Sequence, residues 1–517
     1  MKKYIYILWF SLLSILATGA LANSGEGMVK IGYTFMDEEG NQSVQQATFN
    51  QYEGFGLSLE KFLYRFDNGL RVSADLQRVT LNNRNMNLAV EKFGLFGLRF
   101  FNHQYRRTYN YSGSTNTRRH RTGASFWVIP HQYVTVFGGG AYVGKSGKQS
   151  DLFDLNQPEA PVKVDYNQAE YNAGLRVNYR GRMLQAEYRG AKFKDNEKPI
   201  RDQGRYKIRT LAVASVPNYE WLILSGGFQH FETKYKETEY KISANTVWGG
   251  VTAKLPRNFT FRYGFYFDRT GSDSDLVATD NVSHAVYLTR IWPGRAGLTG
   301  GYQHDVNDDF EDAFKADAGY FSGWLKPGGG FELRGEHGFR REEVDDGARL
   351  LGNEDRNHFK VSVRYKKSEY GSAVLKFDSK NRENNQLGSE VDFVRLAFDG
   401  TLELKEYGMV SAGYAFASGE YENDEQAFQF GDHLVHADIN SREYYDITAG
   451  FGFVYYRSKQ DLNVESLTLR FNAAYRFLED YKLEINYNVH NFDNFQIWDE
   501  YYTANIVEVN LIKSISF

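Results

Sequence analysis

The chain has 517 residues, of which 61 are basic and 65 are acidic, and its net charge is −4. So balanced a composition carries no electrostatic signature of nucleic-acid binding. The absence of cysteine excludes a disulfide framework, thiolate metal sites and covalent attachment of c-type haem by this chain. Aromatic residues reach 16% and proline occurs 8 times. This is typical of long strands with aromatic side chains at membrane interfaces.

The first 22 residues have the form of a secretory signal peptide. Lys2 and Lys3 precede the apolar run 4–16, and a small-residue cleavage site ends at Ala22. The run is shorter than the roughly 20 residues that a transmembrane helix needs. We therefore expect cleavage between Ala22 and Asn23, followed by a short N-terminal segment, 23–54, with one expected strand at 28–35.

Regular alternation of apolar and polar residues begins at Phe55 and continues almost to the end. Segments 70–77, 359–365, 467–477 and 481–489 all show this period of two. Successive strand side chains point to opposite faces, so each segment has one apolar and one polar face. The mean hydropathy of −0.55 suits a barrel, which interleaves lipid-facing and polar residues. The sequence predicts an all-β fold, with a large antiparallel transmembrane β-barrel over residues 55–517.

The connections between the expected strands alternate between short and long. Short ones carry turn residues, as in Asp67-Asn-Gly69, Arg180-Gly-Arg182 and Pro293-Gly-Arg295. Longer polar segments lie around residues 144–164, 194–206, 268–282, 340–355, 379–389 and 418–444. Short periplasmic turns and long extracellular loops are the plan of outer-membrane barrels. The alternative class, a soluble β-sandwich or propeller, has shorter strands and no reason for this asymmetry.

About 25 segments qualify as strands, and bacterial single-chain barrels have even strand numbers, so we expect about 24–26 strands. The count is ambiguous between residues 418 and 464. Either a further strand lies near Ala427–Asp438, or Ile447–Arg457 belongs to an extracellular hairpin. The sequence leaves both alternatives open.

The polar face of each strand must point into the lumen, because an Arg or Lys facing the bilayer midplane costs about 2–4 kcal/mol. Near the C-terminus the predicted lumen-facing residues are Ser466, Thr468, Arg470, Asn472, Arg476, Lys482, Glu484, Asn486 and Asn488. The last segment alternates as well and ends at Phe517. A terminal aromatic of this kind resembles the assembly signal of outer-membrane barrels, so we expect Phe517 to be read by the assembly machinery.

No catalytic constellation stands out, and we expect neither an enzyme nor a metal site. His433 and His436 have a metal-compatible spacing, but they are expected in a polar loop without a further ligand at a fixed offset. The acidic run Asp305–Asp312 lacks the order and the glycine of a calcium loop. Gly138-Gly-Gly140 follows a strand and opens no helix, so it indicates a bend or a close-packing site in a sheet and not a phosphate loop.

A barrel of this size should have a wide lumen. Only about 30 mature residues precede the first regular strand, too few for a plug domain with its own core. Either something else fills the lumen, or inward side chains and folded-in loops narrow it.

Several segments resemble the MtrB/PioB-type barrels of porin–cytochrome electron conduits. They are Phe49-Asn-Gln-Tyr-Glu-Gly54 with Gly56, the strand pair around Asp67-Asn-Gly69, Arg118-Arg-His-Arg-Thr-Gly-Ala-Ser125, and the Tyr-rich strands between Ser466 and Asn494. The resemblance is spread over most of residues 45–517. Some members of that family carry an N-terminal cysteine pair that this chain lacks.

The resemblance implies a sheath in the bacterial outer membrane. Such a barrel holds and insulates a multihaem c-type cytochrome, which carries the haem and passes electrons between periplasm and cell surface. The alternative from the residues alone is a general or solute-selective diffusion porin. An adhesin, with its function in segment 418–444, is a third class. Other expected partners are the lipid bilayer and the assembly machinery, and nucleic acid is not expected.

Overall fold

A computed structural model describes the protein over twelve stretches of the chain. They are residues 24–42, 51–109, 115–150, 161–216, 219–273, 278–309, 313–345, 354–367, 369–384, 388–423, 425–497 and 500–516. The expected signal peptide, its cleavage site at Ala22 and Asn23, and Phe517 lie outside the described residues.

Within the described residues, 26 antiparallel strands form one sheet. The first thirteen are β1 (Ser24–Gly40), β2 (Gly54–Arg65), β3 (Leu70–Gln77), β4 (Asn85–Lys92), β5 (Phe96–Thr108), β6 (Asn116–His131), β7 (Val134–Ser150), β8 (Pro161–Tyr179), β9 (Arg182–Asp195), β10 (Gln203–Val216), β11 (Tyr219–Tyr235), β12 (Lys241–Leu255) and β13 (Phe259–Ser272). The second thirteen are β14 (Ala278–Trp292), β15 (Ala296–Asp309), β16 (Ala313–Gly328), β17 (Phe331–Asp345), β18 (Glu354–Lys367), β19 (Gly371–Asn384), β20 (Ser389–Glu403), β21 (Gly408–Glu422), β22 (Ala427–Ser441), β23 (Ile447–Gln460), β24 (Val464–Leu478), β25 (Tyr481–Asn494) and β26 (Tyr501–Ser516). Two short 3-10 turns, Pro199–Arg201 and Pro256–Asn258, interrupt the connections.

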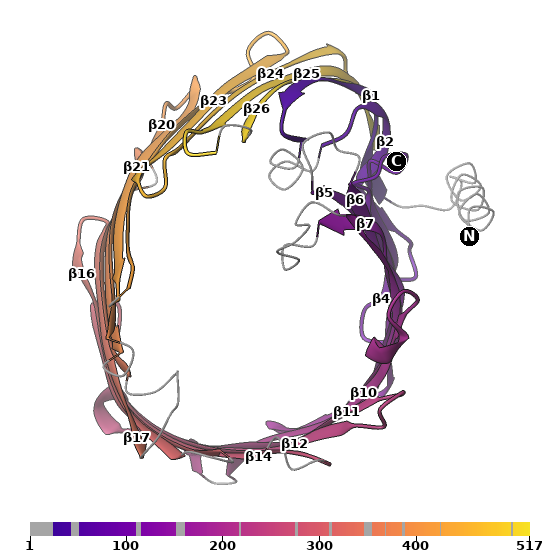
Figure 1. Ribbon diagram of the computed structural model, residues 1–517. Helices are drawn as coiled ribbons and strands as arrows, with labels where there is room; N and C mark the ends of the chain where they lie inside the picture. The colour runs from indigo at the N-terminus through magenta and orange to yellow at the C-terminus, as the bar shows by residue number, and fades with distance from the viewer. Residues whose placement is uncertain are drawn as a thin grey trace.

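The sheet closes into a ring because β1 pairs with β26 (Figure 1). The register runs from Glu26 opposite Ser516 to Gly40 opposite Tyr502. The predicted large antiparallel barrel is thereby confirmed, with a strand number at the upper end of the expected range. The barrel wall begins at Ser24 and not at residue 55, because the expected N-terminal segment supplies β1 and so closes the sheet.

The region 418–464 contains the further strand that one alternative required. β22 lies between β21 and β23 and pairs with both. The expected long loop 418–444 is therefore mostly strand, and Ile447–Arg457 belongs to the wall. Because the number of strands is even, the start of β1 and the end of β26 lie on the same rim of the barrel. This is the rim that carries the short turns.

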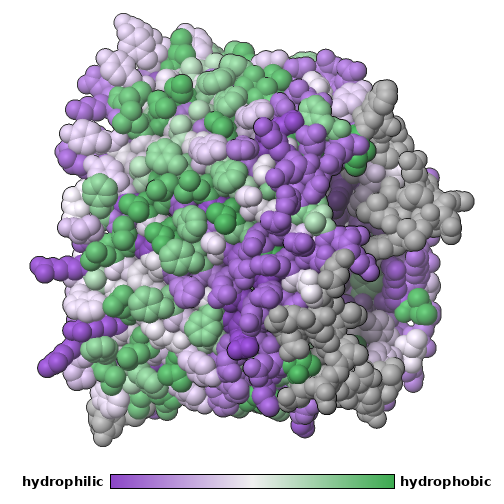
Figure 2. Space-filling model, turned by 60° about the vertical axis from the view of Figure 1, so that its left-hand side comes forward, coloured by the Kyte–Doolittle hydropathy of each residue, from purple (hydrophilic) through white to green (hydrophobic). Residues whose placement is uncertain are grey.

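The two faces of the wall differ as the alternation predicted. Outward positions carry large apolar side chains that are exposed in the isolated chain, for example Ile31 at 42%, Phe35 at 52% and Phe471 at 42%. Figure 2 shows such side chains gathered in a broad band on the outside of the barrel, beside a hydrophilic band. The apolar band is the surface that lipid covers in a membrane.

One part of the sheet folds into the barrel. The connection 78–84 crosses the inner side of β2, where Val79 N donates to Leu57 O at 2.9 Å. Arg78 reaches Glu508 on the inner face of β26 at 3.6 Å. Asn82 accepts a hydrogen bond from Gln104 on β5 at 3.1 Å, so the extracellular half of β5 follows this connection inward. Figure 1 shows β5–β7 bending toward the interior of the ring. We call the connection 78–84, together with the extracellular ends of β5–β7, the inward fold.

Part of the inner face of the wall is buried near the β1–β26 seam. Tyr502, Ala504 and Ile506 of β26 are at most 1% exposed, and Met36 packs against them. Tyr52, just before β2, donates its hydroxyl to Arg106 O at 3.1 Å, and burial raises the pKa of its phenol.

Candidate functional site

The nine residues predicted to face the lumen lie on two neighbouring strands. Ser466, Thr468, Arg470, Asn472 and Arg476 lie on β24, and Lys482, Glu484, Asn486 and Asn488 lie on β25. The register places Arg470 opposite Asn488, Asn472 opposite Asn486, and Arg476 opposite Lys482. All nine share one face of the wall, while their role toward a partner stays a prediction.

Ion pairs connect this polar face to distant strands. Arg470 lies 2.8 Å from Asp438 of β22. Glu484 accepts a hydrogen bond from Lys30 of β1 at 3.1 Å, across β26, and a second one from Asn486 at 3.0 Å. Charges of both signs are therefore paired along this wall.

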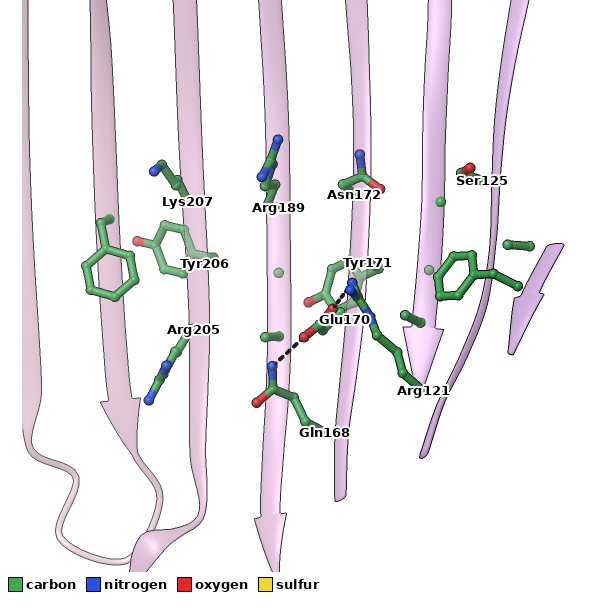
Figure 3. A pocket seen from close by; sticks show the side chains of 18 residues that line it. Arg121, Ser125, Gln168, Glu170, Tyr171, Asn172, Arg189, Arg205, Tyr206 and Lys207 are labelled. Carbon is green, nitrogen blue, oxygen red and sulfur yellow. Dashed lines mark hydrogen bonds and ion pairs between the residues drawn. The ribbon is translucent and has the colours of Figure 1, made fainter. Parts of the chain in front are cut away.

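A different charge balance holds on the wall formed by β6–β10. A hollow of about 460 Å³ lies there, lined by Arg121, Arg189, Arg205 and Lys207 with one carboxylate, Glu170 (Figure 3). The charged side chains come from alternate positions of four strands, β6, β8, β9 and β10, because the alternation places them all on the lumen side.

The carboxylates of this wall already have partners. Glu170 accepts hydrogen bonds from Arg121 at 2.9 Å and from Gln168 at 2.8 Å. On β9, Glu187 accepts from Arg189 at 2.7 Å and from Asn172 at 3.3 Å. Both carboxylates are therefore bound to side chains within the wall.

Arg205 and Arg209 of β10 contact neutral groups on the inward face, and Arg209 also lies opposite Glu187 in the register. Arg205 Nε donates to the side-chain oxygen Oε1 of Gln203 at 3.1 Å. The Arg209 guanidinium lies 5.5 Å from the centre of the Trp248 ring. Lys207 stands between them on the same face. We call Arg205, Lys207 and Arg209 the β10 cation row.

Seven inward-facing aromatic rings lie over glycines of the adjacent strand. In each pair the register places the two residues directly opposite, and a β-carbon on the glycine would crowd the ring. The pairs are Trp127 over Gly97, Phe101 over Gly123, Phe137 over Gly174, Trp248 over Gly227, Tyr287 over Gly301, Trp324 over Gly297 and Phe430 over Gly419. These rings lie along the wall and do not project toward the barrel axis. The sequence shows the aromatics and glycines, but only the register brings each pair together.

The weaker sequence motifs take ordinary places in the sheet. His433 and His436 lie in β22 and not in a loop. A separation of three residues puts two strand side chains on opposite faces, so His433 bonds to Tyr414 at 2.8 Å while His436 lies 3.7 Å from Asp399. Gly138–Gly140 lies inside β7, as close packing required.

Among the described residues, no group of three or more His, Asp or Glu side chains is arranged to hold a metal ion. No helix in that part of the chain is long and apolar enough to cross a membrane.

Comparisons with known proteins identify the architecture. No family model and no curated protein matches the chain. Among solved structures, it is similar to the siderophore receptor PirA from Pseudomonas aeruginosa, with 10% identity and a TM-score of 0.52 over 81% of this chain and 80% of that one. The copper transporter OprC is similar at 10% identity and a TM-score of 0.50, over 95% and 80%. A variant of the ferric enterobactin receptor PfeA from P. aeruginosa matches at 9% and 0.50, over 96% and 80%.

Identities this low establish the fold alone. Together with the closed ring and its apolar outer band, they define the class of protein: a large β-barrel of the bacterial outer membrane. The predicted localisation is thereby confirmed.

Proposed function

We propose that this barrel encloses a multihaem c-type cytochrome and insulates it across the outer membrane, so that electrons pass between periplasm and cell surface. The sequence resemblance to MtrB/PioB-type barrels motivates the proposal. The observation that carries it is the flat inner wall, where large aromatic rings lie over glycines. A pore that selects solutes needs side chains that project toward its axis, whereas a sheath needs a smooth wall against which a folded protein fits.

The dimensions support an enclosed protein. Strands about 4.8 Å apart and tilted by about 40° give a 26-strand wall a Cα diameter of about 50 Å. Side chains reduce this to a lumen of about 40 Å in a circular barrel. A globular domain of about 100 residues has a radius of gyration near 13 Å, which corresponds to a sphere about 34 Å across. The inward fold takes some of this width on one side.

The inward fold favours a second candidate, a diffusion porin. Chain segments that fold into a barrel narrow it, and here 78–84 and β5–β7 do so beside the seam. In that case the remaining opening would conduct solutes directly.

Reconstitution separates the two candidates. Liposomes that hold a reducible dye would receive the barrel alone, the cytochrome alone, or the complex, before an external reductant is added. The sheath requires that dye reduction depend on the complex and that a haem-staining protein co-purify with the barrel from native membranes. Stable, uniform conductance of solutes by the barrel alone, without any co-purifying haem protein, would establish the porin.

A further inference from the structure

The lumen has an uneven charge distribution although the whole chain has a net charge of −4. At the seam, Lys30 and Glu484 neutralise each other. On the β6–β10 wall, the carboxylates Glu170 and Glu187 are each paired with an arginine. In the β10 cation row, Arg209 lies directly opposite Glu187, so the three cations of the row share one carboxylate that Arg189 already binds. This wall therefore presents an excess of positive charge to the lumen.

The titratable groups facing the row leave this excess in place. Glu187 on β9 lies opposite Arg209 but is bound by Arg189, and Glu232 on β11 is bound to Lys241 at 2.7 Å on the outward-facing side. Asp195 lies at the far end of β9, where it accepts hydrogen bonds from the backbone of Glu197 and Lys198. On the side of β11 the row meets Gln229 and Phe231, which are neutral.

We propose that the protein enclosed by the barrel presents an acidic surface to the β6–β10 wall and is held there in one rotational orientation; this rests on the proposed function. Arg205 and Arg209 are exposed on the inward face of β10, and Arg205 and Lys207 line the hollow (Figure 3). Carboxylates on the partner would complete the charge pairing that the wall lacks. Complementary charge of this kind fixes orientation and specificity more than it adds affinity.

Charge reversal on β10 tests the proposal. The test variant is Arg205→Glu, Lys207→Glu and Arg209→Glu together, with a second variant carrying glutamine at the same three positions. The matched control is Lys192→Glu, Lys194→Glu and Lys234→Glu. These lysines lie on the strands that flank β10 but on the outward face, where Lys192 and Lys234 stand on either side of Gly204.

Two measurements are made on each barrel. The first is the reversal potential of the empty barrel in a potassium chloride gradient near 10 mM, where the Debye length of about 30 Å spans most of the lumen. The second is the amount of haem protein that co-purifies from native membranes. We expect chloride preference in the wild-type and control barrels, a reversed preference in the glutamate variant, and a reduced one in the glutamine variant. Co-purified haem protein should fall at least about tenfold in the glutamate variant only.

The outcomes separate this inference from the proposed function. An empty wild-type barrel without chloride preference overturns the cationic wall and leaves the sheath standing. Undiminished haem protein on the folded glutamate variant likewise overturns the acidic contact alone. If no haem protein co-purifies with the wild-type barrel, the sheath fails and the acidic occupant fails with it.

Discussion

Side chains on the outer face of the wall must be apolar to suit lipid, whereas those on the inner face can be charged. The neighbouring residues Leu469 and Arg470 allow this difference to be tested. Leu469 lies beside Phe453 and Val489 on the outward face, while Arg470 bonds to Asp438 on the inward face. Leu469→Arg should destabilise the barrel by about 2–4 kcal/mol, because the charge would enter lipid. Arg470→Leu should leave assembly intact. Heat-modified mobility in gels measures folded barrel, and equal yields of both variants would contradict the orientation.

The rings that lie over glycines give a second prediction at this scale. Gly301→Ala should destabilise the barrel by about 1–3 kcal/mol, because the added methyl group meets the Tyr287 ring and overpacks the wall. Gly300→Ala is the matched control, since a β-carbon there has no atom within 4 Å. The denaturant midpoint of the two variants in detergent decides the outcome. Equal midpoints would mean that the ring moves aside at no cost.

Two isoleucines of the last strand show why the alternation is incomplete. Ile506 and Ile512 occupy inward positions that the lumen would make polar. They are 1% and 9% exposed, because neighbouring parts of the chain cover this face at the seam. Apolar residues are favourable there for the same reason as in any protein core.

At the scale of elements, the connection 78–84 of the inward fold contacts the seam through the ion pair between Arg78 and Glu508. Exchanging the charges of Arg78 and Glu508 tests whether this ion pair stabilises the barrel. Arg78→Glu and Glu508→Arg should each lower stability, and the double variant should recover part of the loss, with a coupling of about 0.5–1 kcal/mol. Chemical denaturation of the four proteins gives this coupling. Strictly additive losses would show that the pair is not in contact.

β22 shows where periodicity fails as evidence for a strand. Its inward face carries Phe428, Phe430 and Leu434, while Gln429 and Gly431 face outward. Near the extracellular end the outward face leaves the lipid, so nothing requires it to be apolar there. The pattern that identifies a membrane strand is thus absent from about half of this one.

At the scale of the whole molecule, the proposed function requires that the haem be bound by the enclosed cytochrome and not by the barrel. The chain has no cysteine, so covalent c-type attachment to it is chemically excluded. After denaturing electrophoresis, peroxidase staining for haem should therefore appear only at the mass of a co-purified protein. Staining at the mass of the barrel itself would contradict this assignment of roles.

The sequence by itself determined the all-β class, the outward and inward faces of most strands and the membrane in which they lie. These follow from a local rule, since each side chain must suit either lipid or water. Tertiary structure alone decided that Ser24–Gly40 closes the ring against β26, that 78–84 folds inward, and that the carboxylate opposite the β10 cation row, Glu187, is already bound by Arg189. Those facts depend on which distant residues become neighbours, as with Lys30 and Glu484. Register sets such pairings through hydrogen bonds between strands, and no periodicity within a single strand encodes them.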